Sequence, residues 1–131
     1  MLLSVKTQIV AGKKKVAKPI LLLAIIQAVS EKSIIKNEIK YTDELEKIYL
    51  SLYQKYGEML SPMKYPFYHL QFDGFYHIKG YLPTKSPTPK QLKEKIEFAY
   101  LDEQLWNLLQ EEENRELIRQ RIEAFFDLTI K

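Results

Sequence analysis

The stretch KPILLLAIIQAV, Lys18–Val29, decides how the rest of the chain must fold. Apolar residues occupy every helical face of this stretch, so a helix formed here has to be buried on nearly all sides. Pro19 suits the first turn of such a helix, where its missing N–H costs no hydrogen bond. Lys18 then stands at the helix entrance, where free backbone N–H groups favour an anion. We therefore predict a central buried helix with a basic residue at its start.

The composition fits one small domain built around this helix. The chain has 131 residues, of which 46% are hydrophobic and 28% charged, and a chain of this length buries roughly two-thirds of its unfolded surface. We predict a single domain over residues 1–131. The sequence contains no cysteine, which excludes a disulfide framework, a thiol nucleophile and any Cys-containing zinc site. We expect a cytoplasmic protein.

The apolar run Pro19–Val29 could instead be read as a membrane or export segment. It has eleven residues, whereas a bilayer-spanning helix needs about 20. Lys13–Lys18 before it resemble the basic start of a secretory signal, and Ala28–Ser30 at its end resemble a cleavage site. Export would, however, remove the best core helix, so we favour a protein without membrane contact.

A second helix is predicted over residues 43–56. Asp43 with Glu46 resembles a capping box, and Gly57 is a helix terminator. The apolar stripe of this helix consists of Leu45, Ile48, Tyr49, Leu52, Tyr53 and Tyr56. Its spacing is that of an amphipathic helix, and the prolines that follow predict a loop over residues 61–66.

Two aromatic-rich runs, Phe67–Gln71 and Phe75–Lys79, flank the dipeptide Asp73–Gly74. Such a dipeptide between two runs of this kind is typical of a β-hairpin. Because side chains alternate along a strand, this hairpin would place His69 and His77 on opposite faces.

The remainder of the chain predicts a proline loop, Pro83–Pro89, and three helices. The first is capped by Thr88-Pro89-Lys90-Gln91 and uses Leu92, Ile96 and Ala99 as its apolar stripe. The others are Asp102–Leu109, which Asp102 caps, and Leu117–Phe126, whose apolar residues are Leu117, Ile118, Ile122, Phe125 and Phe126. The fold class is therefore α+β and mostly α: a compact helical domain of about five helices with one small antiparallel β-hairpin.

The net charge of +3 hides a gradient along the chain. Residues 1–40 carry +6, residues 41–100 carry +1 and residues 101–131 carry −4. The basic part contains Lys13, Lys14, Lys15 and Lys18, directly before the buried helix. No acidic residue lies near them in the sequence. Lysines combined with exposed rings, such as those around Tyr65 and Pro66, are suited to phosphate contact and stacking. Nucleic acid is the first candidate partner.

Catalytic and metal sites are disfavoured. The two histidines, on opposite hairpin faces, would not converge on a metal, and the chain contains neither a G-x-S-x-G motif nor a glycine-rich phosphate loop. Glu111–Glu113 are most simply the solvated entry of a helix. We predict no catalytic residue, no metal and no cofactor.

Three motifs in order resemble a known family. Lys18-Pro19 with the apolar helix, PFYHL at Pro66–Leu70, and DGFY at Asp73–Tyr76 are similar to the DNA sulfur-binding domain of McrA-like, HNH-type restriction endonucleases. Segments Ala99–Leu109 and Leu117–Phe126 resemble the end of that domain, so the resemblance covers nearly the whole chain.

The resemblance implies recognition of phosphorothioate DNA, in which sulfur replaces a non-bridging phosphate oxygen. It implies an apolar sulfur pocket formed by Tyr65, Pro66 and His69, with Lys18 approaching the modified phosphate. Ala17 stands at a position where the resemblance suggests a polar residue. The other lysines expected to contact DNA are Lys13, Lys14, Lys15, Lys64, Lys90 and Lys93.

The leading hypothesis is a non-catalytic module that binds double-stranded, phosphorothioate-modified DNA in a restriction-like system. The HNH nuclease of the family has no counterpart in these residues, so the chain is either a recognition module that works with a nuclease on another chain, or a relic or antagonist. The alternative is a protein–protein interaction module that docks on a nuclease or another partner without contacting DNA. The third hypothesis is that the protein is an enzyme.

Overall fold

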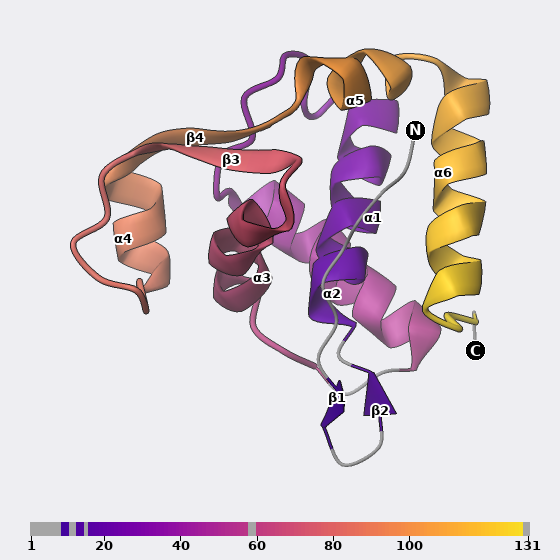
Figure 1. The fold of residues 1–131 in the computed structure, drawn as a ribbon, viewed down its shortest axis with the longest axis horizontal. Helices are drawn as coiled ribbons and strands as arrows, with labels where there is room; N and C mark the ends of the chain where they lie inside the picture. Colours follow the sequence, from indigo (N-terminus) through magenta and orange to yellow (C-terminus); the bar gives the residue numbers. More distant parts are fainter. Residues whose placement is uncertain (1–8, 11–12, 15, 58–59, 130–131) are drawn as a thin grey trace.

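The computed structural model describes residues 9–10, 13–14, 16–57 and 60–129. Figure 1 shows helix α1 running through the middle of the molecule, with the other elements arranged around it. The elements in chain order are β1 (Ile9–Val10), β2 (Lys13–Lys14), α1 (Ala17–Ser30), α2 (Asp43–Tyr56), α3 (Lys64–His69), the 3-10 turn η1 (Leu70–Asp73), β3 (Tyr76–Gly80), α4 (Pro89–Glu94), β4 (Ile96–Leu101), α5 (Glu103–Leu108) and α6 (Glu112–Phe125).

The prediction of a central buried helix is confirmed. All residues of α1 from Pro19 to Val29 except Gln27 are buried, and α1 packs against α2, α3 and α6. Pro19 lies in the first turn, as expected. None of the helices in the described ranges is long and apolar enough to cross a membrane.

Helix α2 has the predicted limits, but a different residue caps it. Gly57 ends the helix with φ of 65°, a left-handed conformation that glycine adopts without steric cost. At the other end, the Thr42 hydroxyl accepts a hydrogen bond from the Leu45 N–H at 3.1 Å. The proposed capping box at Asp43 is therefore wrong. Asp43 lies in the first turn of the helix, where its negative charge interacts favourably with the helix dipole.

The predicted α+β class, mostly helical with a small antiparallel sheet, is confirmed, but the proposed hairpin is wrong. Strand β3 pairs with β4, not with Phe67–Gln71, in the register Tyr76↔Leu101 and Ile78↔Ala99. Phe67–Gln71 lies in α3 and η1 instead. The predicted loop over residues 61–66 accordingly ends early, because α3 begins at Lys64.

The helix predicted after the proline loop is confirmed only over its first part. Thr88 and Gln91 form the expected capping box, and Pro89 lies at the start of the helix. The helix ends at Glu94, and Ile96 and Ala99 belong to strand β4. Short helix α4 is therefore part of the connection between the two paired strands.

The last two helices occupy the predicted regions with altered details. Asp102 precedes α5, but its carboxylate makes no capping hydrogen bond. On α6, Ile118 and Ile122 are buried, whereas Leu117 and Phe125, which we expected in the apolar stripe, are exposed. Glu112 and Glu113 form the acidic entry of α6, as expected.

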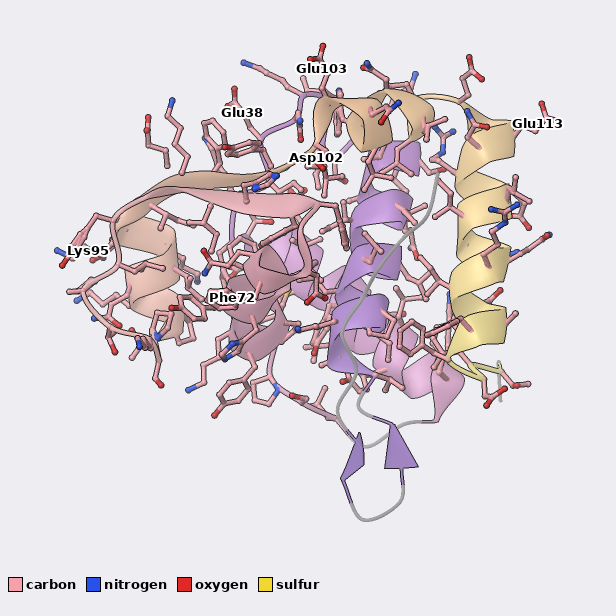
Figure 2. The ribbon with its side chains drawn as sticks, viewed as in Figure 1. Glu38, Phe72, Lys95, Asp102, Glu103 and Glu113 are labelled. Atoms are coloured by element: carbon pink, nitrogen blue, oxygen red, sulfur yellow. The ribbon has the colours of Figure 1, made fainter. Side chains whose placement is uncertain are left out.

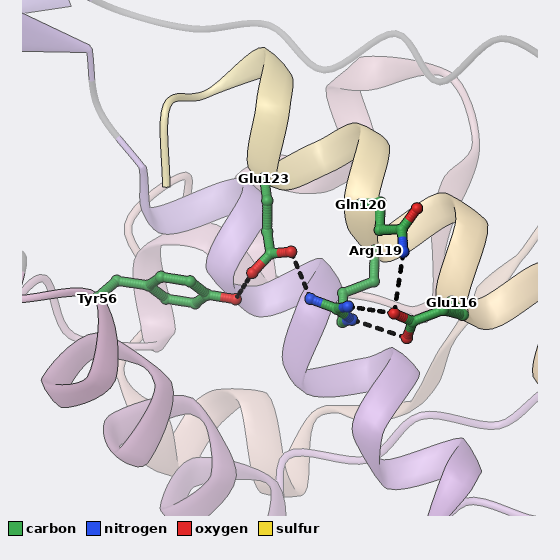
Figure 3. Close-up of polar contacts among 5 residues, drawn as sticks. All are labelled: Tyr56, Glu116, Arg119, Gln120 and Glu123. Carbon is green, nitrogen blue, oxygen red and sulfur yellow. Dashed lines mark hydrogen bonds and ion pairs between the residues drawn. The ribbon is translucent and has the colours of Figure 1, made fainter. Parts of the chain in front are cut away.

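A polar network joins α2 to α6 (Figure 3). The Tyr56 hydroxyl donates to the Glu123 carboxylate at 2.9 Å, and the Arg119 guanidinium donates to both Glu123 and Glu116. The hydrogen bonds from Arg119 lower the pKa of the Glu116 carboxyl. Because Tyr56 and Glu123 are 67 residues apart, this network fixes the end of the chain to the helix core.

Four tyrosines predict unfolding at alkaline pH. Burial, followed by nearby acidic groups, raises the pKa of Tyr41 and of Tyr56 to about 12, and burial raises the pKa of Tyr49 and Tyr76 as well. Unfolded tyrosine ionises near pH 10. The contribution of these tyrosines to the free energy of unfolding is therefore fully present below about pH 10. It is lost as the pH rises through their pKa values in the folded state. We expect the unfolding free energy to fall by about 1.4 kcal/mol per pH unit for each such tyrosine.

Urea unfolding followed by circular dichroism at increasing pH, with absorbance at 295 nm as the readout of tyrosinate, measures this fall. Tyr56→Phe removes one of the four groups and should reduce the pH slope by about a quarter. A folded protein whose tyrosines all ionise near pH 10 would contradict the prediction.

Candidate nucleic-acid interface

The predicted DNA-contacting lysine at the start of α1 makes a buried ion pair. The Lys18 ammonium lies 3.0 Å from the Asp73 carboxylate, whose side chain is fully buried, while the Lys18 side chain is 21% exposed. These two residues are 55 positions apart. The ion pair therefore joins the entrance of the central helix to the segment that follows α3.

Asp73 reaches this position because the chain turns sharply after it. Asp73 is the last residue of η1, and Gly74 follows with φ of 95°, a conformation that favours glycine. The Asp73–Gly74 signal thus marks a real change of chain direction, but at the end of a 3-10 turn and not in a two-residue hairpin. Phe75 comes next, and β3 begins at Tyr76.

The predicted sulfur-pocket residues all lie on α3, which carries a group of exposed rings. Tyr65 is 48% exposed and His69 is exposed, while Pro66 between them is buried. Tyr65 and His69 are four residues apart, so they share one face of the helix. Phe72, 54% exposed, continues the group on η1, with its ring 6.1 Å from that of His69. We call Tyr65, His69 and Phe72 the aromatic ridge.

The core holds α3 in place under the aromatic ridge. Phe67 is completely buried, and its ring packs edge to face against Tyr41 and Tyr76 at centroid distances of 5.1 and 6.1 Å. The Tyr76 hydroxyl also donates to the Phe67 carbonyl oxygen at 2.7 Å. A buried tyrosine whose hydroxyl is hydrogen-bonded supplies both apolar contact and a hydrogen bond that fixes its orientation. The exposed rings are therefore presented by a rigid element.

The remaining predicted lysines lie on several different elements. Lys13 and Lys14 form β2, opposite Val10 and Ile9, whereas Lys15 lies outside the described residues. Lys64 begins α3, with its ammonium 5.0 Å from the centre of the Tyr65 ring. Such a contact is a cation–π interaction, and it places one lysine directly at the aromatic ridge.

Lys90 and Lys93 lie on α4, which packs beside α3. Lys93 is 3.5 Å from the Asp43 carboxylate and also lies over the Tyr41 ring. Lys90 is exposed, and no ion pair joins it to a carboxylate in the part of the chain that the structure describes. Ala17, beside Lys18 in the first turn of α1, is half-buried.

The two histidines are separated, although not in the way the hairpin implied. His69 lies on α3 and His77 on β3. The His77 Nε2 atom is 2.5 Å from the Asp102 carboxylate, and its ring packs against Tyr100. Among the described residues, no group of three or more His, Cys, Asp or Glu side chains could hold a metal ion.

Sequence reasoning missed the ion-pair role of Asp73 and the exposure of Phe72. In the predicted hairpin, Asp73 and Gly74 form the loop, and the Asp73 carboxylate would lie in solvent. The one local signal for Phe72 is its position between two polar residues, Gln71 and Asp73. The Lys18–Asp73 pair has no local signal, because it depends on how α1 packs against α3.

Comparison with protein families gives one match over the full length. The family model described as the ScoMcrA-like DNA sulfur-binding domain matches residues 1–131. No curated protein matches the chain.

Proposed function

Because the chain belongs to the ScoMcrA-like DNA sulfur-binding domain family, we propose that it recognises a phosphorothioate in double-stranded DNA. Tyr65 and His69, on either side of the buried Pro66, contact the sulfur, and Lys18 contacts the same modified phosphate. The observation that supports this most directly is the 3.0 Å ion pair between Lys18 and Asp73. It holds the basic residue of α1 to the segment that carries the aromatic ridge.

The chemistry of the rings suits sulfur better than oxygen. A phosphate oxygen moved against apolar surface loses water hydrogen bonds, while sulfur is larger and less strongly hydrated and loses less. Tyr65 offers a partly exposed ring for this contact, and Lys64 adds positive charge beside it. The difference in desolvation corresponds to about 1 to 3 kcal/mol, which is a preference of roughly 5-fold to 150-fold.

The lysines provide affinity without sequence information. Lys18 has three ammonium hydrogens, of which one points to Asp73, so two remain for a phosphate. We propose that the domain binds without cleaving, and that any strand cleavage belongs to a nuclease outside these residues. The family described by the match is a DNA-binding domain.

Binding to two duplexes that differ by one phosphorothioate tests the proposal. Fluorescence anisotropy across a salt series should give tighter binding to the modified duplex, and Tyr65→Ala should bring the ratio of the two affinities close to one. Phe125→Ala is the matched control, because Phe125 is an exposed ring, 64% accessible, on α6; it should leave the ratio unchanged.

Equal affinity of the wild type for both duplexes at every salt concentration would overturn sulfur recognition. Absence of salt-dependent binding to either duplex would overturn DNA binding and would favour the protein–protein interaction module.

A further inference from the structure

The segment that connects β3 to β4 is strongly basic. Residues 79–95, here called the basic lobe, contain five lysines and one glutamate, Glu94, and so carry +4, while the whole chain carries +3. The lysines are Lys79, Lys85, Lys90, Lys93 and Lys95. All other residues together therefore carry a charge of −1, so positive charge is concentrated in this short segment.

Three of the five lysines have no acidic partner among the residues that the structure describes. Lys79 lies 3.6 Å from the Glu97 carboxylate and Lys93 lies 3.5 Å from that of Asp43. Lys85, Lys90 and Lys95 are exposed, and no ion pair joins them to a carboxylate within the described ranges. Because no carboxylate of the described residues pairs with these three ammonium groups, they are available to bind an external anion.

The lobe is a rigid support for these charges. The Thr88–Gln91 capping box fixes the start of α4, Leu92 anchors the helix with 1% of its surface exposed, and Pro87 is buried in the loop before it. Lysines on a fixed scaffold lose less conformational freedom when they bind than lysines on a free chain. Their spacing is therefore a property of the fold.

The lobe also lies next to the proposed sulfur site. Helix α4 packs against α3, which carries Tyr65 and His69. Figure 2 shows Phe72 beside α3 and Lys95 at the far end of the lobe, where α4 passes into β4. The lobe thus extends away from the aromatic ridge. DNA seated on the ridge would continue past the site by many base pairs, with one phosphate charge per ~1.7 Å of its axis.

We propose that the basic lobe is a second DNA contact, in which Lys85, Lys90 and Lys95 bind phosphates that flank the modified one. This inference rests on the proposed function and extends it. The contact is independent of base sequence and of sulfur, so it strengthens binding to every duplex equally. The two contacts then have different roles: the aromatic ridge distinguishes sulfur from oxygen, and the basic lobe binds the flanking phosphates.

The test is the triple variant Lys85→Gln, Lys90→Gln, Lys95→Gln, measured with modified and unmodified duplexes of about two helical turns. The slope of log affinity against log salt should become shallower by about 2 to 3, since each lost phosphate contact removes about 0.9. Affinity at about 0.1 M salt should fall by about 10-fold to 100-fold for both duplexes, and the ratio between the duplexes should stay that of the wild type.

The matched control removes the same charge elsewhere. Lys36→Gln, Lys47→Gln, Lys55→Gln changes three exposed lysines outside the lobe and should leave the salt slope nearly unchanged. An unchanged slope in the lobe variant, or an equal change in the control, would overturn the inference. A wild type without sulfur preference, combined with a reduced slope in the lobe variant, would overturn sulfur recognition and leave the lobe standing. A wild type that binds neither duplex would overturn both.

Discussion

Replacing Lys18 with methionine is expected to lower the free energy of unfolding by about 3 kcal/mol. The reason is the location of its partner: the Asp73 side chain is fully buried, and removal of Lys18 leaves a buried carboxylate without its cation. Breaking a buried ion pair on one side is costly because the desolvated charge remains. The expected loss lies at the low end of the usual range because Lys18 itself is 21% exposed.

Urea unfolding followed by circular dichroism measures this loss, and two further variants interpret it. Lys18→Met combined with Asp73→Asn removes the buried charge together with its partner, and should recover more than half of the lost stability. Lys93→Met breaks the exposed contact with Asp43, in which the side chains are 46% and 82% accessible, and should cost less than about 1 kcal/mol. A Lys18→Met protein as stable as the wild type would contradict the role of the ion pair.

The same geometry determines how the DNA contact of Lys18 must be tested. Weak binding by the single variant would mix a folding defect with the loss of a phosphate contact. The double variant with Asp73→Asn avoids this mixture, because it removes the buried charge. It should bind both duplexes more weakly and reduce the salt slope by about 1, with the folded fraction checked by circular dichroism.

Elements whose burial follows from local spacing could be predicted from the sequence. The apolar run of α1, the i, i+3, i+4 stripe of α2 and the Thr88–Gln91 capping box are each contained within one helix. Their periodicity reports directly which face is buried. The limits of α2 and the start of α4 were accordingly correct.

Strand β4 could not be predicted because a β-bulge imitates a helical spacing. The register skips Glu97: Lys79 pairs with Phe98 and Gly80 with Ile96. This extra residue brings Ile96 and Ala99, three positions apart, to the same buried face, whereas a regular strand would place them on opposite faces. Three-residue spacing is typical of a helix, so the pattern predicted one.

The candidate site likewise has a part that local sequence could predict and a part that depends on tertiary packing. Tyr65, Pro66 and His69 are neighbours in sequence, and a resemblance to a family could select them together. The partnership of Lys18 with Asp73 spans 55 residues and arises from the packing of α1 against α3. The sequence predicts a loop over residues 61–66 and a strand over Phe67–Gln71, which puts Tyr65 and His69 in different elements. Helix α3 includes both residues and places them on one face.

Replacing Gly80 with alanine is expected to destabilise the protein by at least about 3 kcal/mol. Gly80 has φ of +132°, a region that residues with a side chain rarely adopt, and this strain costs about 1 to 3 kcal/mol. In addition, an alanine Cβ would lie 2.6 Å from the Ile96 Cα on the paired strand. A backbone atom in a sheet cannot move away cheaply, so β3 and β4 would have to separate at the bulge from which the basic lobe extends.

Gly74→Ala separates the two contributions. Gly74 also has a positive φ, +95°, but its added Cβ would meet no atom within 4 Å, so this variant suffers the strain without the clash. Urea unfolding should therefore rank wild type, Gly74→Ala and Gly80→Ala in order of falling stability. Because the clash opens the sheet beneath the lobe, Gly80→Ala should also weaken DNA binding and make its salt slope shallower, even under conditions where the protein is folded. Equal stability losses for the two alanine variants would contradict the close approach of Gly80 to Ile96.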